Sequence, residues 1–206
     1  MLPRRVLLSL AMPLLSITAA HAAPARDATA LVDKLVREGL QALHDERLTP
    51  DARQEQFAMI LEDDFDLPRI ARFTAGRHWS TATEADRQSF VKVFERWIII
   101  TYTDRFSTYS GEGIKVTGSR PDSETTATVF SQLVRESGTA PLKIDWRVRR
   151  DQGDDYRVVD VSVEGVSMLV TQREEFASVI QSNGGTVAGL TKALKNKVSG
   201  GATSRP

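Results

Sequence analysis

Residues 143–149 read Lys-Ile-Asp-Trp-Arg-Val-Arg, and their side chains alternate between charged and apolar. Successive side chains of a β-strand point to opposite faces, so Ile144, Trp146 and Val148 share one face and the charged residues share the other. This pattern predicts a strand of an antiparallel sheet that has one face on the core and one face in water.

The sequence on either side of this stretch predicts three further strands. Residues 114–119, 126–134 and 156–163 are rich in Val, Ile and Thr, which favour strands. Short segments containing Pro, Gly, Ser or Asp separate the strands, as turns between neighbouring strands require. Strands at such short intervals are typical of an antiparallel meander, and we expect about four of them.

Helical patterns precede the strands. Residues 27–43 carry Leu and Val at helical spacing. Thr49-Pro50 has the form of an N-cap followed by Pro at the first helical position. Asp66 has a side chain suited to capping the start of a further helix.

The long helix that follows has an unusual middle. Thr83 and Asp86 resemble a capping box at its start, and we expect it to run over residues 84–107. Residues 97–102, Trp-Ile-Ile-Ile-Thr-Tyr, are apolar almost all round, whereas a surface helix shows an apolar stripe. Other elements must therefore cover most sides of this helix. A central core helix and a helix beside an apolar pocket both explain the pattern.

Two helices are predicted after the strands. Residues 171–174, Thr-Gln-Arg-Glu, form a capping box that opens the first, and Asn183-Gly184-Gly185 ends it. Leu190 and Leu194 belong to a last short helix. The fold class is therefore α+β, with a curled antiparallel sheet of about four strands packed against helices from both ends of the chain and enclosing an apolar pocket.

The N-terminus has the three regions of a secretory signal peptide. Arg4 and Arg5 precede an apolar run over residues 6–20, and Ala20-His21-Ala22 provides small residues for cleavage. We therefore expect residues 1–22 to be removed during secretion.

The remaining sequence predicts one domain over residues 23–198 and a disordered tail over residues 199–206. The chain has no Cys, which excludes disulfides and lipoprotein anchoring. Its 27 Lys and Arg balance 27 Asp and Glu, which gives no electrostatic reason to expect nucleic-acid binding. We expect a monomer.

Catalytic and metal-binding patterns are weak. His44 and His78 have no Ser, Cys or Asp partner in a pattern of known mechanism. Ser167 lacks the second Gly of a nucleophile elbow, and the acidic segment 62–66 lacks the loop Gly of an EF-hand. We predict no enzyme activity, no metal and no cofactor. The alternative is a small isomerase or dehydratase of cone-shaped fold that uses Asp160.

Several segments resemble the MlaC family, the periplasmic lipid-binding components of the lipid-asymmetry maintenance system, also called toluene-tolerance proteins. They include Gly76-Arg77-His78-Trp79, Tyr109-Ser110-Gly111 and, most specifically, Glu164-Gly165-Val166-Ser167-Met168. The similarity spans residues 30–195. Phe65–Ile70 further resembles the hopanoid-biosynthesis-associated branch of the family, as does Gly118–Asp122.

The resemblance implies a periplasmic carrier that moves phospholipid or hopanoid between the inner and outer membranes. The lipid is cargo rather than a cofactor, with its tails in an apolar cavity between sheet and helices. The implied partners are an inner-membrane MCE-domain complex of an ABC transporter and an outer-membrane lipoprotein complex. Phospholipid and hopanoid both remain candidate cargoes.

Position in the predicted elements selects candidate lipid-binding residues, for each of which plain core packing is the alternative. They lie on the long helices and the inner sheet face, with Val166 and Met168 closing one end: Phe73, Trp97, Ile98, Tyr102, Phe106, Val129, Leu133, Ile144, Trp146, Val148, Val166 and Met168. On the wet sheet face, Arg147, Arg149 and Arg157 are either part of a docking surface or solvated charges.

Overall fold

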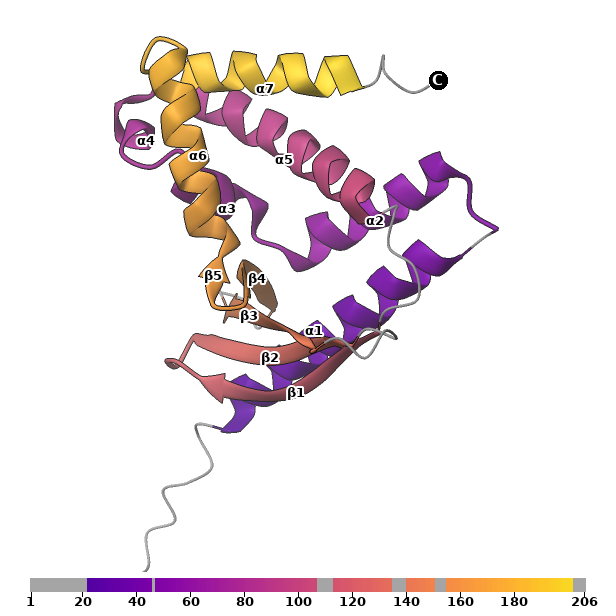
Figure 1. Ribbon diagram of the computed structural model, residues 1–206. Helices are drawn as coiled ribbons and strands as arrows, with labels where there is room; N and C mark the ends of the chain where they lie inside the picture. The colour runs from indigo at the N-terminus through magenta and orange to yellow at the C-terminus, as the bar shows by residue number, and fades with distance from the viewer. Residues whose placement is uncertain (1–21, 46, 107–112, 135–139, 151–154, 202–206) are drawn as a thin grey trace, which may run out of the picture.

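The computed structural model describes residues 22–45, 47–106, 113–134, 140–150 and 155–201. In chain order the elements are α1 (Ala22–His44), α2 (Pro50–Asp64), α3 (Leu67–Thr74), α4 (His78–Thr81), α5 (Glu84–Phe106), β1 (Gly113–Pro121), β2 (Thr126–Val134), β3 (Leu142–Arg150), β4 (Tyr156–Val163), β5 (Val166–Ser167), α6 (Met168–Ser182) and α7 (Val187–Gly201) (Figure 1). Residues 1–21 of the predicted signal peptide and residues 202–206 of the predicted tail lie outside the described residues. α7 continues to Gly201, so it includes the start of the stretch predicted as a tail.

The strands form one antiparallel sheet in the order β1-β2-β3-β4-β5, which is the predicted meander. The short β5 pairs with the end of β4, where we expected the chain to leave the sheet. Pairing is irregular between Val116 and Gly118 in β1 and between Val158 and Asp160 in β4. Such bulges increase the local twist and bend the strands. The α+β fold with a curled antiparallel sheet is confirmed.

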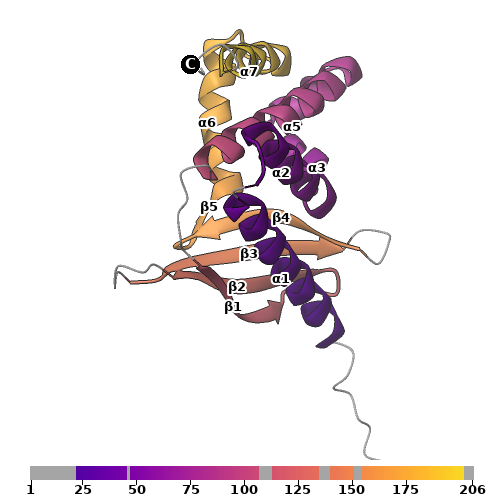
Figure 2. The ribbon, with the colours of Figure 1, turned by 90° about the vertical axis from the view of Figure 1, so that its right-hand side faces the viewer.

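The helices lie on one face of the sheet and beyond its β4 edge. α1 crosses the strands obliquely and packs directly on β1, β2 and β4 (Figure 2). α2 and α3 touch the sheet at β4, while α6 rises from the end of β5 to α7, which lies along α5 (Figure 1). We call α2 to α7 the helical layer.

Helix starts follow the capping residues that the sequence indicates. Thr49 Oγ1 and Asp66 Oδ1 accept hydrogen bonds from backbone amides in the first turns of α2 and α3, at 3.2 and 3.0 Å. At α5, Thr83 Oγ1 accepts from the Asp86 amide (3.1 Å) and its hydroxyl donates to Asp86 Oδ2 (2.7 Å). These bonds satisfy amides that have no partner within the helix.

The start of α6 differs from the prediction. Its N-cap is Ser167, whose Oγ accepts from a backbone amide of the first turn (3.1 Å), and the helix begins at Met168. Thr171, the predicted cap, lies within the helix and donates its hydroxyl to the Ser167 carbonyl (2.9 Å). The predicted end is confirmed, because Asn183 is the C-cap and Gly184 follows with a φ of 83°.

Three groups of buried side chains form the core, and the smallest, Phe57, Leu61 and Leu67, joins α2 and α3 to α5. The sheet cluster lies between α1 and the inner face of the sheet and includes Val32, Val129 and Val148. The helix cluster joins α3, α5, α6 and α7 and includes Phe94 and Phe176. The apolar α5 makes its main contacts with α7, α3 and α2. Within the described part of the chain, no helix has the length and apolar character needed to cross a membrane.

An ion pair joins α1 to the end of α2. Lys34 Nζ lies 3.0 Å from Asp64 Oδ1, and the Asp64 side chain is 5% exposed whereas that of Lys34 is 44% exposed. The hydrogen bond to Asp64 raises the pKa of Lys34 above its ordinary value of 10.5. A Lys whose pKa is raised by folding contributes stability that is complete below its unfolded pKa and is lost as the pH rises through the folded value. The pair therefore stabilises the fold at neutral pH.

We expect Lys34→Ala to lower the free energy of unfolding by about 1–2 kcal/mol at pH 7, because a nearly buried carboxylate loses a charged donor while solvent screens the exposed side of the pair. Lys192→Ala, at an exposed site on α7, is the control and should change it by less than about 0.5 kcal/mol. Urea unfolding measures both. Equal stability of the two variants would contradict a role for the ion pair.

Candidate functional site

An apolar cavity of about 440 Å³ lies between the sheet, α1 and the helical layer. Every long helix except α7 contributes to its walls, as do all four long strands. The lining residues are Leu35, Val36, Gly39, Leu40, Phe57, Ile60, Leu61, Phe65, Leu67, Ile70, Thr74, Phe94, Ile98, Tyr102, Ile114, Leu133, Leu142, Ile144, Trp146, Val159, Asp160, Val161, Val163, Met168, Leu169 and Gln172.

The chemistry of this lining is almost entirely hydrocarbon. Its polar side chains are Thr74, Tyr102, Asp160 and Gln172, and none of the lining residues is Lys, Arg, His or Cys. The Thr74 hydroxyl is occupied, because it donates to the carbonyl of Ala71 (2.9 Å). A cavity of this kind offers dispersion contacts and offers no cation to bind an anion.

Trp146 forms part of the sheet side of the cavity. Its indole N–H donates to Ser131 Oγ (2.9 Å), and the Ser131 hydroxyl donates to the carbonyl of Ile144 (3.0 Å). A buried indole N–H needs such a partner, since an unpaired donor away from water is costly. The polar edge of Trp146 is thus satisfied within the sheet, and the ring is left as an apolar surface.

Asp160 lies at the end of the cavity beside α6. Its Oδ2 accepts from the Ser167 hydroxyl (2.6 Å), and its Oδ1 accepts from the Leu169 amide (3.1 Å). A carboxylate at a helix N-terminus interacts favourably with the amides and with the dipole of the helix. Asp160 therefore holds the first turn of α6, from which Met168 and Gln172 also line the cavity.

The segment Glu164–Met168 brings α6 to this position. Glu164 and Gly165 have φ values of 50° and 80° and turn the chain tightly between β4 and β5. Glu164 Oε1 accepts from the Lys143 amide (2.5 Å), which fixes the turn to β3. A positive φ is unstrained at Gly165, and the turn leaves Ser167 as the N-cap of α6.

Half of the predicted lipid-binding residues line this cavity. Ile98 and Tyr102 come from α5, Leu133 comes from β2, and Ile144 and Trp146 come from β3. Met168 closes the α6 end, as expected.

Three predicted residues are core residues away from the cavity. Val129 and Val148 are fully buried in the sheet cluster, because α1 covers that part of the inner sheet face. Trp97 packs its ring 6.0 Å from that of Phe94 and 5.3 Å from that of Phe176, so it belongs to the helix cluster.

Three others lie elsewhere. Phe73 is 38% exposed, and the Arg173 guanidinium lies 4.9 Å from its ring centroid on the surface between α3 and α6. Val166 is 55% exposed because it sits on the short edge strand β5. Phe106 ends α5, and its side chain lies outside the described residues.

Sequence reasoning missed the contributions of α1, α2 and β4. Leu35 and Leu40 lie on the apolar side of α1, and Phe57 and Ile60 lie on α2. Their spacing gives the buried side of each helix, but it does not say whether that side meets a neighbour or a cavity.

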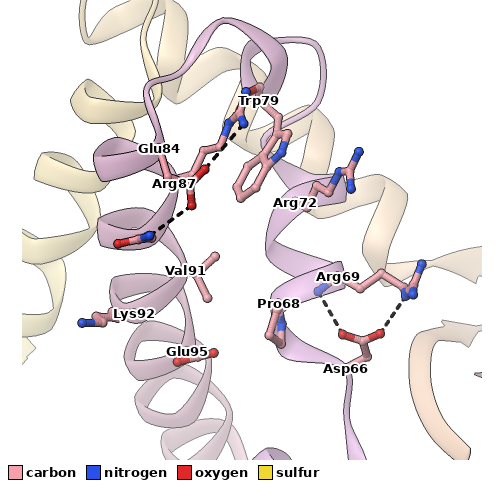
Figure 3. A pocket seen from close by; sticks show the side chains of 11 residues that line it. Asp66, Pro68, Arg69, Arg72, Trp79, Glu84, Arg87, Val91, Lys92 and Glu95 are labelled. Carbon is pink, nitrogen blue, oxygen red and sulfur yellow. Dashed lines mark hydrogen bonds and ion pairs between the residues drawn. The ribbon is translucent and has the colours of Figure 1, made fainter. Parts of the chain in front are cut away.

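A second hollow, of about 640 Å³, lies on the surface between α3 and α5 (Figure 3). Its walls carry charges of both signs. Arg69 Nε pairs with Asp66 Oδ2 at 2.7 Å, and Arg87 donates to the carbonyl of Trp79 (3.0 Å) with its guanidinium 5.6 Å from the indole centroid. Burial raises the pKa of Glu95 on the α5 wall. The charged walls of this groove favour water over lipid tails.

The two histidines make no catalytic arrangement in the described part of the chain. His78 Nδ1 lies 3.1 Å from the carbonyl of Gly185, a contact between the start of α4 and the turn after α6. The side chain of His44 lies outside the described residues. Among the residues that the structure describes, no group of three or more His, Cys, Asp or Glu could hold a metal ion.

The family described as MlaC protein matches residues 33–196 of this sequence. The chain belongs to the MlaC family. A similar fold is found in the phospholipid-binding protein from Ralstonia solanacearum, whose structure was solved in complex with a phospholipid. The two are 23% identical, and the match covers 85% of this chain and 99% of that chain with a TM-score of 0.70.

Of the segments that resemble the MlaC family, the structure describes some and not others. Glu164–Met168 forms the turn that places α6 at the end of the cavity. Tyr109-Ser110-Gly111 lies outside the described residues.

We expect Ser167→Ala to lower the free energy of unfolding by about 1–2 kcal/mol, because α6 loses its N-cap and Asp160 loses a donor. Ser178→Ala, on an exposed face of the same helix, is the matched control and should cost less than about 0.5 kcal/mol. Denaturant unfolding followed by circular dichroism compares them. If the two variants were equally stable, the bond between Ser167 and Asp160 would not be what holds α6.

Proposed function

We propose that this MlaC-family protein is a periplasmic carrier that binds a phospholipid by its tails and moves it between the inner and outer membranes without covalent chemistry. The observation that carries the proposal is the apolar cavity between the sheet and the helices. Its volume of about 440 Å³ falls within the range of about 300–1,000 Å³ that is usual for small-molecule sites. The phospholipid bound by the Ralstonia protein of similar fold supports the same class of cargo.

The energetics of transfer suit a carrier. Burying lipid tails gains about 0.8 kcal/mol for each methylene relative to water. A lipid that leaves a bilayer gains little of this, since its tails move from one apolar environment to another. Binding is then a nearly balanced exchange, and the same site serves for loading and for release, provided that little free energy goes into ordering the cavity.

The charge of the cavity favours a head group that stays outside it. Its one carboxylate, Asp160, would repel a phosphate, and no lining residue is a cation. Burying a phosphate without a partner costs far more than burying tails gains. The tails therefore occupy the cavity, and the head group stays at its rim in contact with water.

Export to the periplasm rests on the predicted signal peptide over residues 1–22. Exchange with an MCE-domain ABC transporter complex at the inner membrane and with a lipoprotein complex at the outer membrane rests on membership of the MlaC family. Both belong to the proposal.

Hopanoid is the second candidate cargo. The segment that resembles the hopanoid-associated branch contributes Phe65, Leu67 and Ile70 to the cavity wall. Native mass spectrometry of protein purified without detergent, followed by extraction, identifies the bound lipid by its mass. A protein that stays empty after incubation with vesicles would refute the carrier function.

The enzymatic alternative would use Asp160 as an acid or base. Both of its oxygens accept hydrogen bonds from the start of α6, and the cavity wall holds no His, Lys or Cys to work with it. A carboxylate that holds a helix in this way is poorly placed to move a proton on a substrate. We therefore favour binding without catalysis.

We expect phospholipids with brominated chains to quench the fluorescence of Trp146, because it lines the cavity. The protein has three Trp, and Trp97→Phe with Trp79→Phe leaves Trp146 as the sole emitter. The matched control keeps Trp79, in the groove of Figure 3, and replaces the other two. Quenching of equal depth in the two proteins would show that the tails do not enter the cavity.

Filling the cavity should prevent lipid binding. Ile98→Trp combined with Ile144→Trp narrows it from both sides, and we expect co-purified lipid to fall about tenfold or more, since overpacking costs about 1–3 kcal/mol. Met59→Trp adds the same bulk at a site on α2 that is 56% exposed and should leave lipid binding unchanged. Thermal unfolding confirms that each variant is folded. Undiminished lipid in the double variant would count against this cavity as the site.

A further inference from the structure

Positive charge gathers on the strands of the sheet. The long strands β1 to β4 carry seven Lys and Arg but two Asp. The whole chain balances 27 Lys and Arg with 27 Asp and Glu. The excess on the sheet is therefore matched by an acidic excess elsewhere, which gives a neutral protein one basic side.

The register of the strands places four arginines on one face. Arg120 of β1 lies opposite Thr128 of β2, which lies opposite Arg147 of β3. Arg149 of β3 lies opposite Arg157 of β4, and cross-strand partners point to the same side of a sheet. We call the sheet face that carries Arg120, Arg147, Arg149 and Arg157 the basic face.

The basic face lies on the side of the sheet away from α1. α1 crosses in front of the strands in Figure 2 and buries Val129 and Val148, which point to the opposite face. Arg120, Arg147 and Arg157 are exposed. These three arginines are therefore accessible to a large flat partner, whereas Arg149 is half-buried.

The sheet offsets part of this positive charge, because Arg147 lies directly opposite Asp160 and Asp145 alternates onto the same face of β3. Like charges directly opposite each other in a sheet are destabilising, and Arg149 and Arg157 are such a pair. Asp122 neutralises Arg120 at 3.0 Å. In the part of the chain that the structure describes, neither Arg147 nor Arg157 has an ion-pair partner.

We propose that the basic face binds the anionic surface of a phospholipid bilayer, so that the carrier rests on a membrane while cargo enters or leaves. A guanidinium forms paired hydrogen bonds with phosphate oxygens, which makes Arg well suited to this surface. The inference goes beyond the proposed function, because adsorption requires head groups with a net negative charge and does not require a lipid in the cavity.

The composition of the face favours a membrane over an acidic protein. Stable protein interfaces have an apolar centre that is depleted of charged residues. The basic face has charged residues rather than an apolar group at its centre, where Asp145 lies opposite Phe130. Phe130 is half-buried, with the Arg120 guanidinium 5.9 Å from its ring centroid. Adsorption to an anionic bilayer needs several cations near the surface and no apolar centre.

The test is co-sedimentation of the full chain with vesicles of phosphatidylcholine containing about one third phosphatidylglycerol. We expect binding at low salt that weakens as salt is added, and little binding to vesicles of phosphatidylcholine alone. Arg147→Gln with Arg157→Gln should weaken binding about fivefold for each arginine removed, or about thirtyfold together. Lys192→Gln with Lys195→Gln, exposed on α7, removes the same charge elsewhere and should leave binding unchanged.

Equal loss in the two double variants would overturn the proposal, since net charge rather than this face would then govern binding. Absence of binding by the unchanged protein, or equal binding to both kinds of vesicle, would overturn it too. So would an acidic protein partner that depends on Arg147 and Arg157 while vesicle binding does not. Quenching of Trp146 by brominated lipid, measured in the same variants, reports cavity binding separately, so failure of the carrier function is distinguished from failure of the basic face.

Discussion

Hydrogen bonds to β4 attach the helical layer to the sheet, and the cavity depends on them. The Asp66 amide, just before α3, donates to the carbonyl of Val158 (3.0 Å). Two residues further along, the Asp160 carboxylate accepts from Ser167 and Leu169 at the start of α6. Both attachments flank the bulge in β4, where the pairing with β3 is irregular. They hold α3 and α6 at the edge of the sheet, so the cavity walls from those helices keep their place.

The cavity persists because the elements around it bury apolar surface in other places. α1 packs on the sheet, and α5 packs on α7, α3 and α2. Ile98 and Tyr102 on α5 therefore face Ile144 and Trp146 on β3 across an open space, although each parent element is fixed by its own contacts. Protein interiors are otherwise close-packed, and a space of this size among apolar side chains is the mark of a binding site.

Local features could be predicted from the sequence and tertiary ones could not. Alternation of polar and apolar residues predicted the strands, and capping residues predicted the starts of α2, α3 and α5. Both kinds of signal depend on residues that are close together in the chain. The start of α6 was misplaced at Thr171, because the carboxylate that favours Ser167 is on another element. Within the site, Trp146 and Val148 share one face of β3. Trp146 borders the cavity and Val148 does not, because α1 covers the sheet at Val148. The spacing of residues in the sequence does not reveal where α1 crosses the sheet.

The division of the core has a thermodynamic consequence. The sheet cluster and the helix cluster share no buried side chain. The half-buried Phe65, Ile70 and Ile98 connect them through the small group on α2 and α3, and the cavity lies between them. Weakly connected parts of a protein open at different free energies, which lowers the cooperativity of heat unfolding. A lipid chain filling the cavity would touch Leu35 on one side and Phe94 on the other and couple the two clusters into one cooperative unit. The cargo would act as the missing part of the core, and calorimetry would show it as a sharper transition as well as a higher melting temperature.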